Sequence, residues 1–299
     1  MPPLPSLKQL QYLVALAEQL NFTRAAEFCF VTQSTLSAGL KELEDVLGAK
    51  LVERDRQTVL MTPLGEEIAR RARDVLAATR DLAELAASTA EPMAGALRLG
   101  LIPTIAPFLL PQAMTLLRER YPALRLSLRE DMTANLLTRL EDGQLDFALI
   151  ALPYSTGNLF VEPLFDDPLW VVGRKGDPEI YAKTVAPSPA LTERLLLLEE
   201  GHCLRDHALQ ACGKTNRQAS GAIEATSLLT LIQMVESGLG IALVPAMAVR
   251  SGLTDSPGLI ARPLRKPSPS RTIALVARRS TSRLVEMKAL GEVIREACL

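Results

Sequence analysis

The chain is poor in residue types that mark several specialised classes of protein. Aromatic residues make up only 4% of its 299 residues, with Trp170 as the single tryptophan, and there are four cysteines and two histidines. Four cysteines are too few for a secreted scaffold held together by disulfides, so we expect reduced thiols. The N-terminus has no basic patch followed by an apolar core, which argues against a signal peptide and favours a cytoplasmic protein.

Long apolar runs and an excess of one charge are also missing. The longest uncharged stretch, 99–117, approaches the length of a membrane span, but Pro103, Pro107 and Pro111 interrupt it. We therefore expect no transmembrane segment and no membrane partner. The formal net charge is −1, so no overall basic excess indicates a nucleic-acid partner. With 48% hydrophobic and 22% charged residues, the chain is instead suited to two or three globular domains.

The first 60 or so residues have the pattern of a helix-turn-helix. A first helix is predicted from the helical spacing of Leu10, Val14 and Ala17. A short helix then follows with Thr23 as its expected N-cap, and a longer one begins at the N-cap Thr32 and stops at Gly48. The apolar stripe of that longer helix consists of Leu36, Leu40, Leu43 and Leu47.

The next segment has the pattern of a wing followed by a long helix. Two short strands are predicted at 50–54 and 58–62, around a turn at 55–57. Thr62 and Pro63 then suit the cap and first position of a helix. The stripe along that helix is narrow and predicts a second helix against it, which we expect to be the same helix of another subunit. Its members are Ile68, Ala72, Val75, Thr79, Leu82 and Ala86.

From residue 95 onward, strand-like and helical stretches alternate over about 200 residues. This rhythm predicts an α/β domain with mainly parallel sheets, and its length suggests two lobes with a ligand crevice at the carboxyl ends of the strands. The predicted strands are 97–101, 124–128, 147–152, 195–198, 241–244 and 272–276.

A DNA-binding surface is the functional interpretation of the polar side chains around the second helix of the helix-turn-helix. Glutamine can read adenine with two hydrogen bonds, and hydroxyl and basic side chains can hold phosphates. The alternative is that these are ordinary solvated surface residues. The candidates are Arg24, Thr32, Gln33, Ser34, Thr35, Ser37 and Lys41, with Arg54 and Arg56 in the wing.

The segment NFTRAAEFCFVTQSTLSAGLKELEDVLGAKLVERDRQTVLMTPLGE resembles the DNA-binding domain of LysR-type transcriptional regulators. The resemblance extends along the whole chain. It implies a winged helix-turn-helix at 1–62, a dimerising linker helix at 63–90 and a two-lobed, periplasmic-binding-protein-like regulatory domain at 91–299. It also implies a homotetramer built as a dimer of dimers. One departure is Ser34, where the family commonly has proline.

The four cysteines differ in their surroundings. Cys29 lies between two phenylalanines and suits a small buried filler, and Cys298, the penultimate residue, suits a frayed tail. Cys203 and Cys212 bracket the segment GHCLRDHALQAC, which also holds both histidines, His202 and His207. Three interpretations are open for this segment: a zinc site, two unconnected thiols, or a redox pair.

A redox pair has favourable chemistry at Cys203. A helix N-terminus and the nearby Arg205 favour a thiolate, which peroxide oxidises to a sulfenic acid that a second cysteine can convert to a disulfide. Nine helical residues separate the two Cα atoms by about 13.5 Å. A disulfide requires roughly 4.4 to 6.8 Å, so its formation must unwind the helix.

The same segment resembles the redox motif of the hydrogen-peroxide-sensing branch of the LysR family, as do the stretches LGLIPTIAPFLLP, LFDDPLWVV, ATSLLTLIQMV and GIALVPAMAV. After Cys212 the chain departs from some members with GKTNRQ. The resemblance implies that Cys203 is the peroxidatic residue and Cys212 the resolving residue. It further implies a peroxide pocket formed or supported by Thr104, Thr133, His202, Arg205, Asp206 and Arg271. From the sequence alone, the threonines suit turns or caps and Arg271 suits a surface position at a strand edge.

The sequence therefore predicts a transcription regulator that senses hydrogen peroxide, with neither cofactor nor metal. The expected partners are promoter DNA, RNA polymerase and a thiol reductant. Two alternatives are a LysR-type regulator that binds a small metabolite in its crevice and a thiol peroxidase with an accessory domain.

Overall fold

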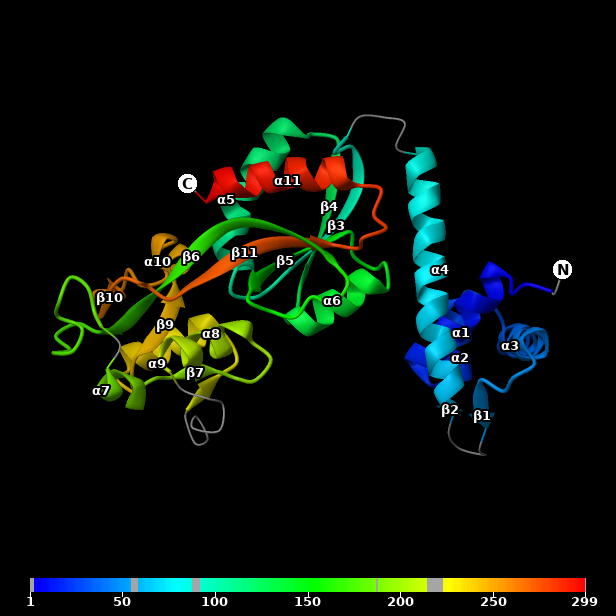
Figure 1. Cartoon of the computed structure of the whole chain (residues 1–299), viewed down its shortest axis with the longest axis horizontal. Helices are drawn as coiled ribbons and strands as arrows, with labels where there is room; N and C mark the ends of the chain where they lie inside the picture. The colour runs from blue at the N-terminus through cyan, green and yellow to red at the C-terminus, as the bar shows by residue number, and fades with distance from the viewer. Residues whose placement is uncertain (1–2, 55–58, 88–91, 187, 214–222, 299) are drawn as a thin grey trace. The chain divides into compact units, whose positions relative to one another are not determined.

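The computed structural model describes residues 3–54, 59–87, 92–186, 188–213 and 223–298. The chain divides into two compact units. The first comprises Met1–Thr89 with Glu141–Gln144, and the second comprises Ala90–Leu140 with Leu145–Leu299 (Figure 1).

The first unit contains the predicted winged helix-turn-helix. Its elements are α1 (Leu7–Gln19), α2 (Phe22–Phe28), α3 (Gln33–Leu47), β1 (Val52–Arg54), β2 (Val59–Met61) and α4 (Pro63–Ala87). Strands β1 and β2 pair antiparallel, as a wing requires. Leu36, Leu40 and Leu43 of α3 are buried and Leu47 packs against the same core, so the predicted stripe is confirmed. In α1 the fully buried positions are Leu13 and Leu16, which lie outside the predicted set of Leu10, Val14 and Ala17.

Local hydrogen bonds explain where these helices begin and end. The Thr32 hydroxyl accepts the Thr35 N–H and Gly48 has a φ of 64°, so both predicted ends of α3 are confirmed. The prediction of Thr23 as the α2 cap is wrong, because the N-cap is Asn21, two residues earlier, whose side chain accepts the Arg24 N–H.

Helix α4 begins where the sequence predicted, since Thr62 Oγ1 accepts the Gly65 N–H at 2.9 Å. Gly65 is required there, because a Cβ atom would lie 2.0 Å from the carbonyl oxygen of Leu51. The expectation that the whole α4 stripe faces another subunit is wrong for its first half. Ala72 is buried and Ile68 packs against the core shared with α1, where burying apolar surface stabilises the unit itself.

The second unit has two lobes that share one long strand, β6 (Phe160–Arg174). Lobe I contains β3 (Gly95–Leu101), α5 (Ala106–Arg120), β4 (Leu124–Glu130), α6 (Thr133–Glu141), β5 (Phe147–Leu152), β11 (Ser270–Ala277) and α11 (Leu284–Ala297). Lobe II contains α7 (Pro189–Glu193), β7 (Leu197–Leu198), α8 (Cys203–Ala211), β8 (Glu224–Ala225), α9 (Leu228–Glu236), β9 (Ala242–Pro245), α10 (Ala246–Arg250) and β10 (Leu259–Pro263).

The expectation of mainly parallel sheets is wrong. The main sheet has the order β10-β6-β11-β5-β3-β4, with β9 also on β6. Its β3/β4 and β3/β5 pairs are parallel, whereas β6 pairs antiparallel with β9, β10 and β11, and β11 with β5. These pairs are antiparallel because the chain crosses from lobe I to lobe II through β6 and returns through β11. Neither β6 nor β10 was predicted, and the prolines and acids within β6 obscured its pattern.

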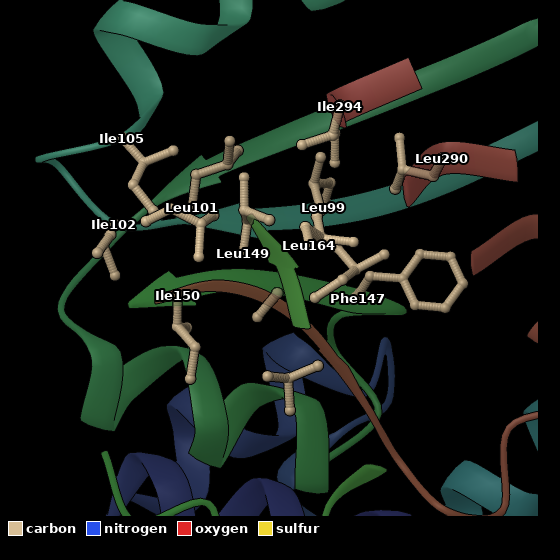
Figure 2. Close-up of a cluster of buried hydrophobic side chains, with 14 of the residues drawn as sticks. Leu99, Leu101, Ile102, Ile105, Phe147, Leu149, Ile150, Leu164, Leu290 and Ile294 are labelled. Carbon is tan, nitrogen blue, oxygen red and sulfur yellow. The ribbon is translucent and has the colours of Figure 1, made fainter. Parts of the chain in front are cut away.

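A leucine-rich and isoleucine-rich core holds lobe I together. Helices α5 and α11 lie on one side of its sheet and α6 on the other (Figure 1). Figure 2 shows Leu290 and Ile294 of α11 above Leu99 and Phe147, while Ile150 is directed to the opposite side from Leu149. This alternation follows from the two-residue period of a strand buried on both faces. Among the described helices, none is long and apolar enough to cross a membrane.

Candidate functional site

Helix α8 places the two cysteines of interest at its opposite ends. Cys203 is its first residue and Cys212 is its C-cap. Cys203 is buried in the lobe I core, whereas Cys212 packs against the lobe II core. None of the four cysteines, all of which lie in described parts of the chain, forms a disulfide. The predicted helical separation of Cys203 and Cys212 is therefore confirmed.

A narrow pocket surrounds Cys203. Both predicted threonines line it and are only 1% exposed, so the pocket collects side chains from lobe I and from α8. Its empty volume is about 170 Å³, and a water-sized sphere does not fit inside it in this conformation. The lining residues are Ile102, Pro103, Thr104, Met132, Thr133, Gly201, His202 and Cys203.

Arg271 holds one wall of this pocket from behind. It is completely buried, so its interpretation as a surface residue at a strand edge is wrong. Its Nη1 donates to Thr104 Oγ1 at 2.7 Å and its Nη2 donates to the Thr104 carbonyl at 2.9 Å. Because Thr104 Oγ1 accepts from the guanidinium, its own proton is left to donate to another group.

Asp167 is the buried counter-ion of Arg271. One carboxylate oxygen, Oδ2, accepts from both Nε and Nη2 of Arg271 at 3.1 Å, and Oδ1 accepts the Met247 N–H at 3.0 Å. The two residues are direct neighbours across β6 and β11. Asp167 is not among the site residues predicted from the sequence, although an acid within the apolar stretch LFDDPLWVV is a signal for a buried ion pair.

The ionisation of Cys203 differs from the sequence expectation. Burial raises the pKa of the Cys203 thiol, against the opposing effects of the Arg271 charge and the neighbouring Thr133 side chain. The prediction that Arg205 lowers the pKa of Cys203 is therefore wrong in two respects. The pKa is raised, and the cation that acts on the thiol is Arg271. Apart from the Cys203 thiol beside it, the buried hydroxyl oxygen of Thr133 has no hydrogen-bond partner among the described residues, so it can also bind a ligand.

His202 is placed in the pocket as predicted, but in its neutral form. Burial lowers its pKa, opposed by a hydrogen bond to the Thr226 backbone and by the charge of Glu199. Its Nε2 is buried and has no hydrogen-bond partner in the part of the chain that the structure describes. A neutral imidazole exchanges protons and does not supply a fixed positive charge, so His202 is suited to proton transfer.

Two other predicted pocket residues lie outside the pocket. Arg205 is buried, but its Nη1 donates to the Leu198 carbonyl at 2.8 Å and to Glu224 at 2.7 Å, which ties α8 to β7 and β8. Asp206 is exposed in the first turn of α8, and its charge raises the pKa of Cys203. Both positions follow from the helical geometry, because α8 directs successive side chains to different sides.

The remaining cysteines have structural surroundings. Cys29 is half-buried and packs against the core of the first unit, as predicted. The prediction of a frayed tail at Cys298 is wrong, because it caps α11 and packs against the lobe I core. Burial raises the pKa of both thiols. Within the described residues, no three His, Cys, Asp or Glu side chains are grouped so as to hold a metal ion.

The predicted DNA-facing residues lie together on the outside of the helix-turn-helix. Thr32, Gln33, Ser34, Thr35, Lys41 and Arg24 are exposed, and Ser37 is partly exposed. The Thr32 hydroxyl is within hydrogen-bond distance of Ser34 Oγ (2.9 Å) and Thr35 Oγ1 (2.8 Å), which gathers three hydroxyls at the start of α3.

An open groove connects this face with the wing, lined in part by Ser34, Ser37, Lys41 and Lys50. Glu44, an acid close to this surface, is held by Lys50 at 2.8 Å and by the backbone N–H of Leu51. Arg56 and the side chain of Arg54 lie outside the described residues, as does most of the segment GKTNRQ.

Two family models match the chain. Residues 7–66 match the bacterial regulatory helix-turn-helix of the lysR family, and residues 90–299 match the LysR substrate binding domain. Together they account for both units of the fold.

Several named relatives match over nearly the full length. The chain is 44% identical to the HTH-type transcriptional regulator EstR of Acinetobacter baylyi, over 99% of this chain and 98% of EstR. It is 40% identical to the DNA-binding transcriptional dual regulator OxyR of Escherichia coli, over 97% and 95%.

Solved structures of OxyR proteins also match this chain over nearly its full length. A full-length OxyR variant from Pseudomonas aeruginosa matches with a TM-score of 0.78 and 38% identity, covering 98% of both chains. A hydrogen-peroxide-bound OxyR mutant from Corynebacterium glutamicum matches with a TM-score of 0.67 and 34% identity, covering 99% and 94%. The chain belongs to the LysR family of bacterial DNA-binding transcription regulators.

Proposed function

We propose that this regulator senses hydrogen peroxide by oxidation of Cys203 and stores the signal as a Cys203–Cys212 disulfide. The observation that carries the proposal is the position of Cys203 in a narrow pocket beside two buried threonine hydroxyls. Peroxide offers a protein little beyond its hydrogen-bonding groups, and hydroxyl side chains both donate and accept. The similarity to OxyR proteins, one of them bound to peroxide, supports the same assignment.

Each pocket group has a role in the first step. Thr104, whose oxygen accepts from Arg271, donates to one peroxide oxygen, and Thr133 orients the other. His202, whose Nε2 has no hydrogen-bond partner among the described residues, relays the thiol proton to solvent. The Cys203 sulfur then attacks one peroxide oxygen, the O–O bond breaks, and the second oxygen leaves as water after receiving a proton. Cys203 becomes a sulfenic acid.

The second step converts this oxidation into a change of shape. The Cys212 sulfur attacks the Cys203 sulfur, the S–O bond breaks, and a second water leaves. In the thiol form nine helical residues hold the two Cα atoms about 13.5 Å apart, against the roughly 4.4 to 6.8 Å of a disulfide. Helix α8 must therefore unwind, and Cys203 must leave the lobe I core for the disulfide to form.

A regulator that binds a small metabolite is the second candidate, because the name of EstR does not refer to peroxide. The pocket argues against it at this site. Sites for drug-sized ligands occupy about 300 to 1,000 Å³, whereas the pocket at Cys203 does not admit even a water-sized sphere. Any ligand requires this pocket to open, and a molecule as small as peroxide requires the least opening. The relatives are transcription regulators, which favours a regulator over a thiol peroxidase.

The redox state of the two cysteines controls transcription from promoter DNA. We assign base reading to Gln33 and backbone contacts to Arg24, Thr32, Ser34, Thr35, Ser37 and Lys41, with Arg54 and Arg56 of the wing as further backbone contacts. The working assembly is a homotetramer that acts in the cytoplasm with RNA polymerase. A thiol reductant returns the disulfide to thiols.

Peptide mapping of the reduced full-length protein after treatment with one equivalent of peroxide tests the proposal. We expect a peptide pair joined through Cys203 and Cys212. In Cys212→Ser, a sulfenate-trapping reagent should label Cys203, and Cys203→Ser should give neither product.

The remaining cysteines provide matched controls. Cys29→Ser and Cys298→Ser should form the same disulfide as the unaltered protein, because neither residue lies in the pocket. A sulfenate on Cys212 but not on Cys203 would reverse the assigned roles. Unchanged thiols at both positions after peroxide would refute the switch and leave the metabolite-binding regulator.

A further inference from the structure

Phe30, in the turn of the helix-turn-helix, is placed where it cannot stabilise the fold. Its side chain is 95% exposed, and its φ of 55° lies in the left-handed region that side chains other than glycine and asparagine rarely adopt. The neighbouring Phe28 is 62% exposed. Cys29 and Val31, which alternate with them, pack against the core. The end of α2 and the turn after it therefore direct Phe28 and Phe30 outward, while Cys29 and Val31 anchor the turn to the core.

The backbone at Phe30 explains why this position is costly. The Phe30 N–H donates to the Glu27 carbonyl at 3.1 Å and the Val31 N–H donates to the Ala26 carbonyl at 3.0 Å. These two bonds form a Schellman motif at the end of α2, in which the left-handed position is most often glycine. Glycine or asparagine would avoid the steric strain, and a polar residue would avoid exposing an aromatic ring.

We propose that Phe30 is a DNA contact whose ring packs on the deoxyribose–phosphate backbone at the edge of the major groove. Strained, exposed side chains are retained where they serve a function. Phe30 lies two residues before Thr32, next to the exposed hydroxyls that open α3. The ring therefore extends the surface that we assign to DNA binding at the start of α3. The inference does not depend on the peroxide switch.

The position of the turn favours the backbone over the bases. In helix-turn-helix proteins the first helix crosses the DNA backbone and the start of the second helix enters the major groove. Phe30 connects these two parts, so it lies at the rim of the groove. An aromatic ring contacts the apolar face of a sugar without neutralising a phosphate. Such a contact adds affinity without adding to the salt dependence of binding.

The test compares the affinity of full-length variants for two duplexes of equal length, one selected from a random pool with the unaltered protein and one of unrelated sequence. Phe30→Asn should bind both duplexes about tenfold more weakly, equivalent to about 1.4 kcal/mol. Its melting temperature should stay the same or rise, because asparagine suits the left-handed position. The slope of affinity against salt concentration should not change.

Two further variants sharpen the comparison. Phe30→Tyr keeps the ring and should retain the affinity of the unaltered protein. Tyr181→Asn removes a side chain that is 83% exposed in the second unit, and it should leave DNA binding unchanged. Three results would overturn the proposal: unchanged affinity of Phe30→Asn, a loss confined to the selected duplex, or a loss accompanied by a lower melting temperature. The second would indicate base reading and the third a structural role.

Discussion

The ionisation of Cys203 is governed by opposing effects of burial and charge. Burial disfavours the thiolate more strongly than Arg271 favours it, so the pKa of Cys203 is raised above its ordinary value. Only the thiolate is a good nucleophile. At neutral pH the thiol form is therefore the majority form before peroxide binds, and the reactive fraction grows as the pH rises.

The rate of Cys203 oxidation should consequently increase with pH. Because the folded pKa lies above neutrality, we expect about a tenfold rise for each pH unit between about pH 6 and 8. Rapid-quench trapping of the sulfenic acid in Cys212→Ser measures this first step alone. A rate that is already level at neutral pH would contradict the raised pKa and indicate a thiolate in the resting protein.

At the scale of elements, strands β6 and β11 connect the lobes through one buried ion pair. Asp167 and Arg271 are both completely buried, and they also hold the Met247 backbone of lobe II and Thr104 of lobe I. Removing one partner of such a pair leaves the other charge buried and uncompensated, which is strongly destabilising.

Asp167→Asn should therefore lower the free energy of unfolding of the second unit by about 3 kcal/mol or more. Trp170 lies on the same strand, so its fluorescence in urea reports this unfolding. The adjacent Asp166→Asn is the matched control, because Asp166 is exposed and accepts only the Thr272 hydroxyl among its described side-chain contacts. We expect it to cost less than about 1 kcal/mol. Similar small losses in both variants would show that the buried pair does not stabilise the unit.

At the scale of the whole molecule, helix α4 exposes apolar side chains that its own unit does not cover. Val75 is 46% exposed and Leu82 is 70% exposed, and they are seven residues apart on one stripe. A seven-residue apolar repeat is typical of helices that pair with another helix. This supports dimerisation through the second half of α4, whereas the first half packs within its own unit.

Leu82→Glu should shift the assembly toward smaller species, because in the proposed pairing of two α4 helices it places a charge in their apolar contact. Sedimentation velocity measures the change across a range of protein concentrations. Leu4→Glu makes the same substitution at a leucine that is 80% exposed outside α4, and its assembly state should match the unaltered protein. An unchanged distribution for Leu82→Glu would exclude this part of α4 from the interface.

The elements that depend on local pattern could be predicted from the sequence. The capping of α3 by Thr32 and its end at Gly48, the strand 147–152, and the helix between Cys203 and Cys212 all follow from neighbouring residues. Local hydrogen bonds and apolar periodicity set these features, so a short window of sequence contains their cause. Strand β6 could not be predicted in this way, because its pairing with β9, β10 and β11 stabilises a stretch whose own pattern is irregular.

The sequence by itself determined that this is a LysR-type regulator with a cysteine pair across one helix, because motif and spacing are properties of the chain. Only the tertiary structure decided which cation acts on Cys203. Arg205 is two residues from Cys203 but is bound to Glu224, whereas Arg271 is far away along the chain and acts on the thiol through space. Electrostatic effects depend on distance and burial in the folded protein, and separation along the chain measures neither.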